Sequence, residues 1–242
     1  MEFTIKIADV NIGITSVFDG VSKLCKDYLT DECPDFCIRT DLEDIAFERE
    51  KAKREAAFEH RPYFDFSDAY LETLAAYRKI AVGILPFDAF LMHGAVVGRG
   101  GEAYLFTAPS GVGKTTHTRF WLQNFKDAFI VNGDKPILRF KDGAVYACGT
   151  PWAGKEGENK NVMLPLKSVC ILSRGKTNEI ERVDFGRIYP LLIGQAYRPA
   201  TEKELSKTMS LIKKLGESTA FYLLKCNLDP NAAKVAFEGM NG

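Results

Sequence analysis

The sequence predicts an α+β fold, with a mixed, largely antiparallel β core flanked by helices and preceded by a small N-terminal α/β segment. The first observation behind this prediction is that short β-rich runs occur in pairs joined by glycine-containing turns, at 98–101 and 141–143, which is typical of hairpins. The second is a change in the residue pattern: runs with charges at helical spacing end before about Phe90, and the β-rich runs of these hairpins follow. We therefore expect an N-terminal segment over 1–85 and a second domain over 86–242.

The N-terminal segment is predicted to contain one strand and three helices. Residues 3–8 alternate like a strand, and 17–29 has the spacing of an amphipathic helix. The run 41–60 carries both charge signs, with Glu and Lys at helical spacing, which favours a solvated helix over an interaction surface. A further helix begins at about Ser67, and its apolar face comprises Leu71, Leu74, Ala75, Tyr77, Ile80 and Ala81.

The second domain is predicted to consist of hairpins and buried strands with helices between them. The expected strands cover 91–97, 103–106, 129–131, 137–140, 145–148, 167–173 and 220–226. The expected helices cover 115–125, 185–195, 201–216 and the last residues of the chain. Between them, the polar stretch 151–162 is predicted to be a loop.

Composition and charge exclude several classes of protein. Lys+Arg and Asp+Glu both total 32, so there is no basic excess of the kind that a nucleic-acid partner requires. No apolar run approaches the roughly 20 residues that cross a bilayer, and the N-terminus lacks the pattern of a signal peptide. We therefore expect a cytoplasmic protein with neither a membrane nor a nucleic acid as partner. The six cysteines are scattered, which favours reduced thiols over a disulfide framework or a zinc site.

Residues 108–115 have the pattern of a phosphate-binding loop, with Ala108 in place of the usual first glycine. Glycines in such a loop let successive backbone N–H groups turn inward toward an anion, and the following helix adds its N-terminal dipole. Lys114 is predicted to reach the β- and γ-phosphates, and the Thr115 hydroxyl to bind Mg²⁺. We therefore predict a nucleoside triphosphate, ATP with Mg²⁺, bound by Ser110, Gly111, Val112, Gly113, Lys114, Thr115 and Thr116.

Two further side chains are candidates for this site. Asp134 follows the apolar run 129–131, and a carboxylate at a strand tip beside a phosphate loop typically holds Mg²⁺; the alternative is an ordinary Asn-Gly-Asp turn. His93 lies in a predicted strand that a hairpin brings beside the strand feeding the loop. It is either a histidine of the core or a group that orients a carboxylate or carries a proton. Lys114, Asp134 and His93 are accordingly the predicted catalytic residues, and Thr115 and Asp134 the predicted metal ligands.

The run from His93-Gly94 through 103–106 and 110–115 to 131–134 resembles the catalytic domain of HPr kinase/phosphorylase, in the phosphoenolpyruvate-carboxykinase-like superfamily. This resemblance implies ATP and Mg²⁺ binding and a related β core. The family usually has two adjacent aspartates, one on the metal and one acting as base, whereas here the first position is Gly133. The family's signature for phosphorolysis has no clear counterpart, and residues 1–85 do not resemble the regulatory domain of that enzyme.

Three functional hypotheses follow. The leading one is an ATP-dependent kinase that phosphorylates a serine-like hydroxyl of a small protein, a peptide or a metabolite. The second is a sensor or accessory protein that binds ATP without transferring phosphate, and Gly133 is its main support. The third is an ordinary P-loop kinase of small metabolites, which would require a sheet of strand–helix–strand units. Loop 151–162 either covers the acceptor through Trp152, Lys155, Asn159 and Asn161 or is a surface turn.

Overall fold

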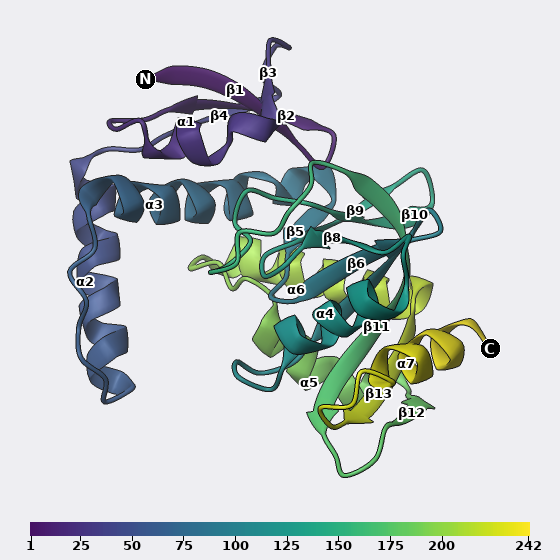
Figure 1. Ribbon diagram of the computed structural model, residues 1–242. Helices are drawn as coiled ribbons and strands as arrows, with labels where there is room; N and C mark the ends of the chain where they lie inside the picture. Colours follow the sequence, from purple (N-terminus) through teal and green to yellow (C-terminus); the bar gives the residue numbers. More distant parts are fainter. The chain divides into compact units, whose positions relative to one another are not determined.

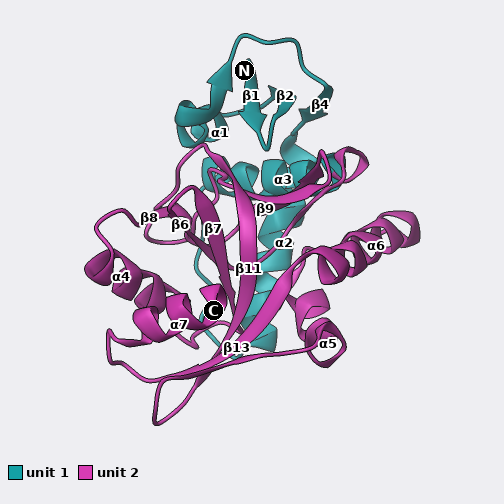
Figure 2. Cartoon of the chain, turned by 90° about the vertical axis from the view of Figure 1, so that its right-hand side faces the viewer, with its two compact units in different colours: residues 1–84 teal, residues 85–242 magenta.

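The computed structural model describes residues 1–242, which form two compact units, Met1–Ile84 and Leu85–Gly242 (Figures 1 and 2). Both units combine helices with sheets in which most strand pairs are antiparallel, so the predicted α+β class is confirmed. No helix is long and apolar enough to span a bilayer.

The first unit contains a four-stranded sheet in the order β3-β1-β2-β4. The strands are β1 (Glu2–Ile7), β2 (Val10–Thr15), β3 (Leu29–Thr30) and β4 (Phe36–Arg39). β1 and β2 form an antiparallel hairpin whose turn residues, Ala8 and Asp9, both have positive φ, as a tight two-residue turn requires. β4 runs parallel to β2. The first strand was predicted from the sequence, and its hairpin partner β2 was not.

The helix predicted over 17–29 is wrong in extent. Only α1 (Gly20–Leu24) and a 3₁₀ turn over Lys26–Tyr28 are helical. The backbone N–H groups of Val17 and Phe18 donate to the Glu72 carboxylate instead of joining a helix. The chain therefore enters the helical conformation only after these residues.

The two long helices of this unit follow the sequence prediction closely. α2 (Leu42–Phe58) begins with a capping box. The Asp41 side chain accepts from backbone N–H groups of the first turn, and the Asp44 side chain accepts from the Asp41 backbone N–H. α3 (Asp68–Gly83) is capped by Ser67, whose hydroxyl accepts from Tyr70 N–H at 3.3 Å. α2 buries few residues and is solvated as expected, whereas α3 buries an apolar face comprising Leu71, Ala75, Ala76, Ile80 and Ala81.

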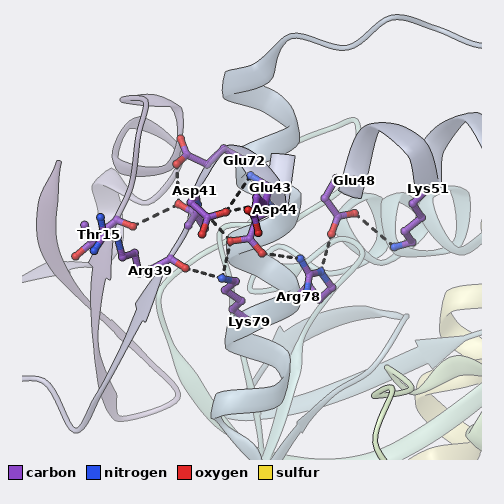
Figure 3. Close-up of polar contacts among 11 residues, drawn as sticks. Thr15, Arg39, Asp41, Glu43, Asp44, Glu48, Lys51, Glu72, Arg78 and Lys79 are labelled. Carbon is purple, nitrogen blue, oxygen red and sulfur yellow. Dashed lines mark hydrogen bonds and ion pairs between the residues drawn. The ribbon is translucent and has the colours of Figure 1, made fainter. Parts of the chain in front are cut away.

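A polar network joins the helices and strands of the first unit (Figure 3). The fully buried Glu72 accepts from Thr40 Oγ1 at 2.6 Å and from two backbone N–H groups. Arg78 on α3 donates to Glu48 at 2.8 Å and to Asp44 at 3.0 Å, both on α2. Each buried carboxylate here has several donors, as burial of charge demands. We interpret the network as structural, because its hydrogen-bond donors and acceptors are paired with one another.

The second unit is built on a nine-stranded sheet in the order β5-β9-β10-β11-β7-β6-β8, with β13 beside β11 and β12 beside β13. β7, β11 and β13 run parallel to one another, and every other pair is antiparallel. The strands are β5 (Ala89–Leu91), β6 (Ala95–Arg99), β7 (Glu102–Thr107), β8 (Phe129–Asn132), β9 (Ile137–Lys141), β10 (Ala144–Cys148), β11 (Met163–Arg174), β12 (Glu179–Arg182) and β13 (Ala220–Cys226).

Both predicted hairpins are present, and one predicted strand is interrupted. Gly100 and Gly101 turn between β6 and β7 with positive φ, as do Asp142 and Gly143 between β9 and β10. The strand expected over 91–97 is broken at 92–94, because the N–H groups of these residues donate to carbonyls outside the neighbouring ladder. β11 begins earlier than expected, and β12 was not predicted at all.

Helices pack against the sheet of the second unit on two sides (Figure 2). α5 (Phe185–Gln195) and α6 (Glu202–Ser218) contribute to one apolar cluster with the β10 and β11 strands. α4 (Lys114–Asn124) and α7 (Ala232–Asn241) contribute to a second cluster, in which Trp121 is fully buried. The sheet is thus the middle layer, and the loop that precedes α4 follows the end of its central strand β7. Figure 1 shows the same unit from another side.

Candidate functional site

The glycine-rich loop joins β7 directly to α4, which is the strand–loop–helix context that its sequence pattern requires. Gly111 and Gly113 have φ of 78° and 123°, a region that residues with a side chain rarely adopt. Gly113 also caps α4, an 11-residue helix whose first N–H groups have no partner within the helix. The loop therefore presents a helix N-terminus and a glycine backbone to the same space.

Lys114 is buried and lies across this loop. Its ammonium donates to the Ala108 carbonyl at 2.9 Å. Burial lowers the pKa of Lys114 because it disfavours the charged form; the Asp134 carboxylate opposes this effect and the Lys135 charge adds to it. A buried cation with only a carbonyl as partner would be stabilised by an anion, such as a phosphate group, placed in the loop.

The fully buried Asn132, at the end of β8, holds the turn that carries Asp134 in place. The Asn132 amide donates to the Thr150 carbonyl and hydroxyl oxygens at 2.9 and 3.1 Å. The side-chain oxygen of Asn132, Oδ1, accepts from the backbone N–H groups of Asp134 and Lys135 at 2.9 and 2.6 Å. The turn that the sequence showed as Asn-Gly-Asp is thus fixed by its first residue.

His93 and Asp134 lie beside each other, with 3.2 Å between His93 Nε2 and Asp134 Oδ1. The other ring nitrogen, Nδ1, lies 2.7 Å from Gln195 Oε1, and the His93 backbone N–H donates to the Gln195 carbonyl. Burial alone would raise the pKa of Asp134, but the hydrogen bond from His93 and the charges of Lys135 and Lys114 outweigh it and hold this pKa below its ordinary value. Asp134 is therefore an ionised carboxylate at neutral pH.

The topology explains why these side chains meet. β6 is antiparallel to both β7 and β8, so the start of β6 lies at the same edge of the sheet as the ends of β7 and β8. His93 precedes β6, the glycine-rich loop follows β7, and Asp134 follows β8. The Thr107 hydroxyl donates to the His93 carbonyl at 2.8 Å and joins two of these segments directly.

A cavity of about 410 Å³ opens between these segments. Of the predicted catalytic, nucleotide-binding and metal-binding residues, seven line it: His93, Ser110, Gly111, Gly113, Lys114, Thr115 and Asp134. Lys155 of loop 151–162 lines it as well. Val112 and Thr116 face elsewhere, into a second cavity on the other side of the loop. One space therefore combines a glycine-rich loop, a cation, a hydroxyl, a carboxylate and an imidazole.

The donors in this cavity suit Mg²⁺ only in part. The Thr115 hydroxyl and the Asp134 carboxylate are oxygen donors of the kind that Mg²⁺ prefers. The structure contains no cluster of three or more His, Cys, Asp or Glu side chains that would hold a metal by itself. Mg²⁺ usually completes its shell with water and substrate phosphates, so the two donors fit a metal that arrives with a nucleotide.

Loop 151–162 closely approaches the space where a side chain at position 133 would lie. Gly133 N–H donates to the Glu158 carbonyl at 3.0 Å, and a Cβ added at Gly133 would lie 3.0 Å from the Ala153 carbonyl oxygen. The same loop brings Glu156 and Glu158 to the cavity. Arg119 on α4 pairs with Glu156 at 2.7 Å, and Glu158 is exposed.

Three residues of this site were not predicted from the sequence: Asn132, which fixes Asp134; Gln195, the partner of His93; and Glu158, a further carboxylate. Of these, only Asn132 carried a local signal, because asparagine before Gly-Asp favours an Asx turn. Gln195 and Glu158 come from segments far along the chain, and their proximity depends on the fold.

The fold and the site together define an α+β protein with a strand–glycine loop–helix unit at one edge of a mixed sheet. No family model matches the chain, and no curated protein matches it. Among solved structures, the chain is similar to the Hpr(Ser) kinase/phosphatase from Coxiella burnetii, at 9% sequence identity and a TM-score of 0.37. The similarity covers 63% of this chain and 99% of that one. A likeness of this extent establishes neither the family nor the activity of this chain, so the function is judged from the geometry of the site.

Proposed function

We propose that the protein is an ATP-dependent kinase that transfers the γ-phosphoryl group to a serine-like hydroxyl of a small protein, a peptide or a metabolite. The observation that carries this proposal is the convergence of Lys114, Thr115, Asp134 and His93 on one cavity at the glycine-rich loop. A site that only bound phosphate would need the loop and the lysine. The carboxylate and the imidazole beside them are the groups that act on a hydroxyl.

The residues of the chain have distinct roles in the proposed reaction. The backbone of 110–113 and the Lys114 ammonium hold the β- and γ-phosphates, where negative charge is redistributed during transfer. The acceptor oxygen forms a bond to the γ-phosphorus while the bond from that phosphorus to the bridging oxygen breaks, and ADP leaves with the electron pair. Asp134 accepts the hydroxyl proton, and His93 orients the Asp134 carboxylate. Thr115 and Asp134 would hold Mg²⁺, and the metal would supply charge neutralisation for the phosphates.

The resemblance to HPr kinase/phosphorylase supports nucleotide and Mg²⁺ binding more than it supports a particular acceptor. Gly133 stands where that family usually has a first aspartate, and the backbone of loop 151–162 crowds this position. A second carboxylate in this cavity would have to come from that loop, and Glu158 lines the cavity. We therefore do not propose HPr as the acceptor.

The same observation at Gly133 favours one alternative, a sensor or accessory protein that binds ATP and transfers nothing. Asp134 would then serve only as a metal ligand. An ordinary P-loop kinase of small metabolites is not supported, because the sheet of the second unit is mixed rather than parallel.

The test is transfer of labelled phosphate from γ-labelled ATP with Mg²⁺ to hydroxyl acceptors, beginning with free serine and a serine-containing peptide. Asp134→Asn keeps the shape of the side chain and removes its charge. We expect turnover to fall by at least about a hundredfold while nucleotide still binds, because a general base contributes a factor of about 10²–10⁴. Asp142→Asn is the matched control, since Asp142 is an exposed aspartate in a hairpin turn and does not line the cavity.

The outcomes separate the hypotheses. Transfer by the wild type and by Asp142→Asn, with its loss in Asp134→Asn, supports the kinase. ATP binding without transfer to any acceptor supports the sensor. Equal transfer by Asp134→Asn and the wild type contradicts the role given to Asp134, and His93 would be the next residue to replace.

A further inference from the structure

We propose that the nucleoside part of the bound triphosphate lies in a second cavity, on the opposite side of the glycine-rich loop from His93 and Asp134. This inference rests on the proposed function, because it places the remainder of the same ligand. The cavity has a volume of about 530 Å³, ample for a base and a ribose. It is lined by residues 111–113, by one side of α4, and by the turns that follow β11 and β13.

The parallel strands place this cavity where ligands bind in open α/β sheets, outside the carboxyl ends of the strands. β7, β11 and β13 are adjacent and parallel. Their register pairs Ile171 with Thr107 and Arg174 with Cys226, so all three strands end at one edge of the sheet. The glycine-rich loop, the turn at Gly175 and the turn at Asn227 therefore follow one another along this edge.

The two cavities are joined at the loop. Both are lined by Gly111 and Gly113, so a ligand whose phosphates lie in the first cavity can pass over these glycines into the second. Neither glycine has an atom within 4 Å of an added Cβ, which leaves this path open. A nucleoside triphosphate has this form, with an anionic chain at one end and a flat base at the other.

The chemistry of the second cavity differs from that of the first. It contains none of the carboxylates of the first cavity, and its apolar wall comprises Val112, Phe120 and Leu228. Leu228 is 81% exposed, so its side chain is free to pack against a flat apolar group in this cavity. Polar groups from Thr116 and Asn227 lie in the same space. Apolar walls with a few polar groups are typical of sites for bases and other small molecules.

Arg174 stands at the junction of the two cavities. Its guanidinium donates to the Gly111 carbonyl at 2.8 Å, and the side chain is exposed along the second cavity. Arginine is suited both to a phosphate oxygen and to the face of a base. We assign it to the part of the ligand between base and β-phosphate.

The far wall is held rigidly, as a preformed site requires. The Asn227 side chain donates to the Lys176 carbonyl at 2.8 Å, and its backbone N–H donates to Asn178 Oδ1 at 3.0 Å. Gly175 allows the two turns to approach closely, because a Cβ there would lie 2.9 Å from Lys225 Cβ. These bonds join the turn after β11 to the turn after β13.

The experiment compares two ligands that differ only in the nucleoside, Mg·ATP and Mg·tripolyphosphate, by calorimetric titration of the full chain. The variants are Phe120→Ala and Leu228→Ser, neither of which adds charge. Leu42→Ser is the matched control, because Leu42 is an exposed leucine of the first unit. We expect both cavity variants to bind Mg·ATP about tenfold more weakly, since each removes apolar contact with the base. Binding of tripolyphosphate should stay at the wild-type value, which also shows that the variants are folded.

Wild-type affinity for Mg·ATP in both cavity variants would overturn the inference while leaving the proposed function intact. An equal loss of both ligands in these variants would also overturn it, because the nucleoside would then not be what the cavity contacts. A wild-type chain that binds neither ligand overturns the proposed function together with this inference. A wild-type chain that binds tripolyphosphate as tightly as ATP overturns the inference alone.

Discussion

Acidification below pH 6.5 should destabilise the protein through His117, a histidine on α4 directly behind the glycine-rich loop. This residue is only 2% exposed. Its Nε2 accepts from Trp121 Nε1 at 3.1 Å, and its Nδ1 is buried with no partner. Burial lowers the pKa of His117 from an ordinary value of 6.5 to about 3, because nothing in its surroundings stabilises the imidazolium.

The sign and size of the effect follow from this difference. Between pH 6.5 and about 3 the unfolded chain binds a proton at His117 and the folded chain does not. Unfolding therefore takes up a proton in this window, and stability falls as the pH is lowered through it. Above pH 6.5 the contribution is absent, and below about pH 3 it becomes constant. From pH 7.5 to pH 5.0 the expected loss is about 2 kcal/mol, at 1.36 kcal/mol for each pKa unit.

The assay is urea-induced unfolding at pH 7.5 and 5.0 for the wild type and His117→Gln. Glutamine keeps an acceptor for the Trp121 N–H and does not titrate, whereas the carboxylates of the protein titrate alike in both chains. The free energy of unfolding should drop by about 2 kcal/mol more in the wild type than in the variant. Equal drops in the two chains would refute the reasoning, because His117 would then be protonated equally in the folded and unfolded states.

Two further predictions concern residues that sequence reasoning missed. Asn132→Ala should lower the free energy of unfolding by at least about 2 kcal/mol, since it removes the four hydrogen bonds that the buried Asn132 side chain makes, and it should slow phosphate transfer through Asp134. Unfolding as stable as that of the wild type would contradict this. Glu158→Gln should slow phosphate transfer by at least about tenfold if Glu158 serves as the second carboxylate. Glu238→Gln, an exposed carboxylate of α7, is its control, and equal rates in the two variants would exclude Glu158 from the reaction.

The elements that were predicted well are those whose signals are local. The capping residues Asp41 and Ser67 mark the starts of α2 and α3, and the glycine turns mark the hairpins. The class of the fold followed from these hairpins, because they exclude a sheet made only of strand–helix–strand units. Spacing within a window of several residues was sufficient for each of these predictions.

The errors arise where distant residues decide the local structure. Glu72 binds the N–H groups of Val17 and Phe18 and delays the start of α1, and nothing near Val17 in the sequence signals this. The strand at 91–97 breaks because His93 N–H donates to Gln195, about a hundred residues further along the chain. Periodicity alone cannot contain such information.

For the candidate site, the chemical types of the main residues could be predicted from the sequence. Which residues lie next to one another depends on the fold. The loop, Asp134 and His93 were proposed from residue type and order, and the structure brings them to one cavity. Gln195 and Glu158 join them through α5 and loop 151–162, which no motif connects to the glycine-rich loop.

The most direct test of the central claim is the affinity of Mg·ATP for the wild type and for Lys114→Ala, measured by calorimetric titration. Removing the ammonium deletes a charge-assisted contact worth about 1.5–3 kcal/mol, so the dissociation constant should rise about ten- to a hundredfold. Lys203→Ala, an exposed lysine of α6, should leave it unchanged. Equal affinity of Lys114→Ala and the wild type for Mg·ATP would show that the glycine-rich loop is not the nucleotide site.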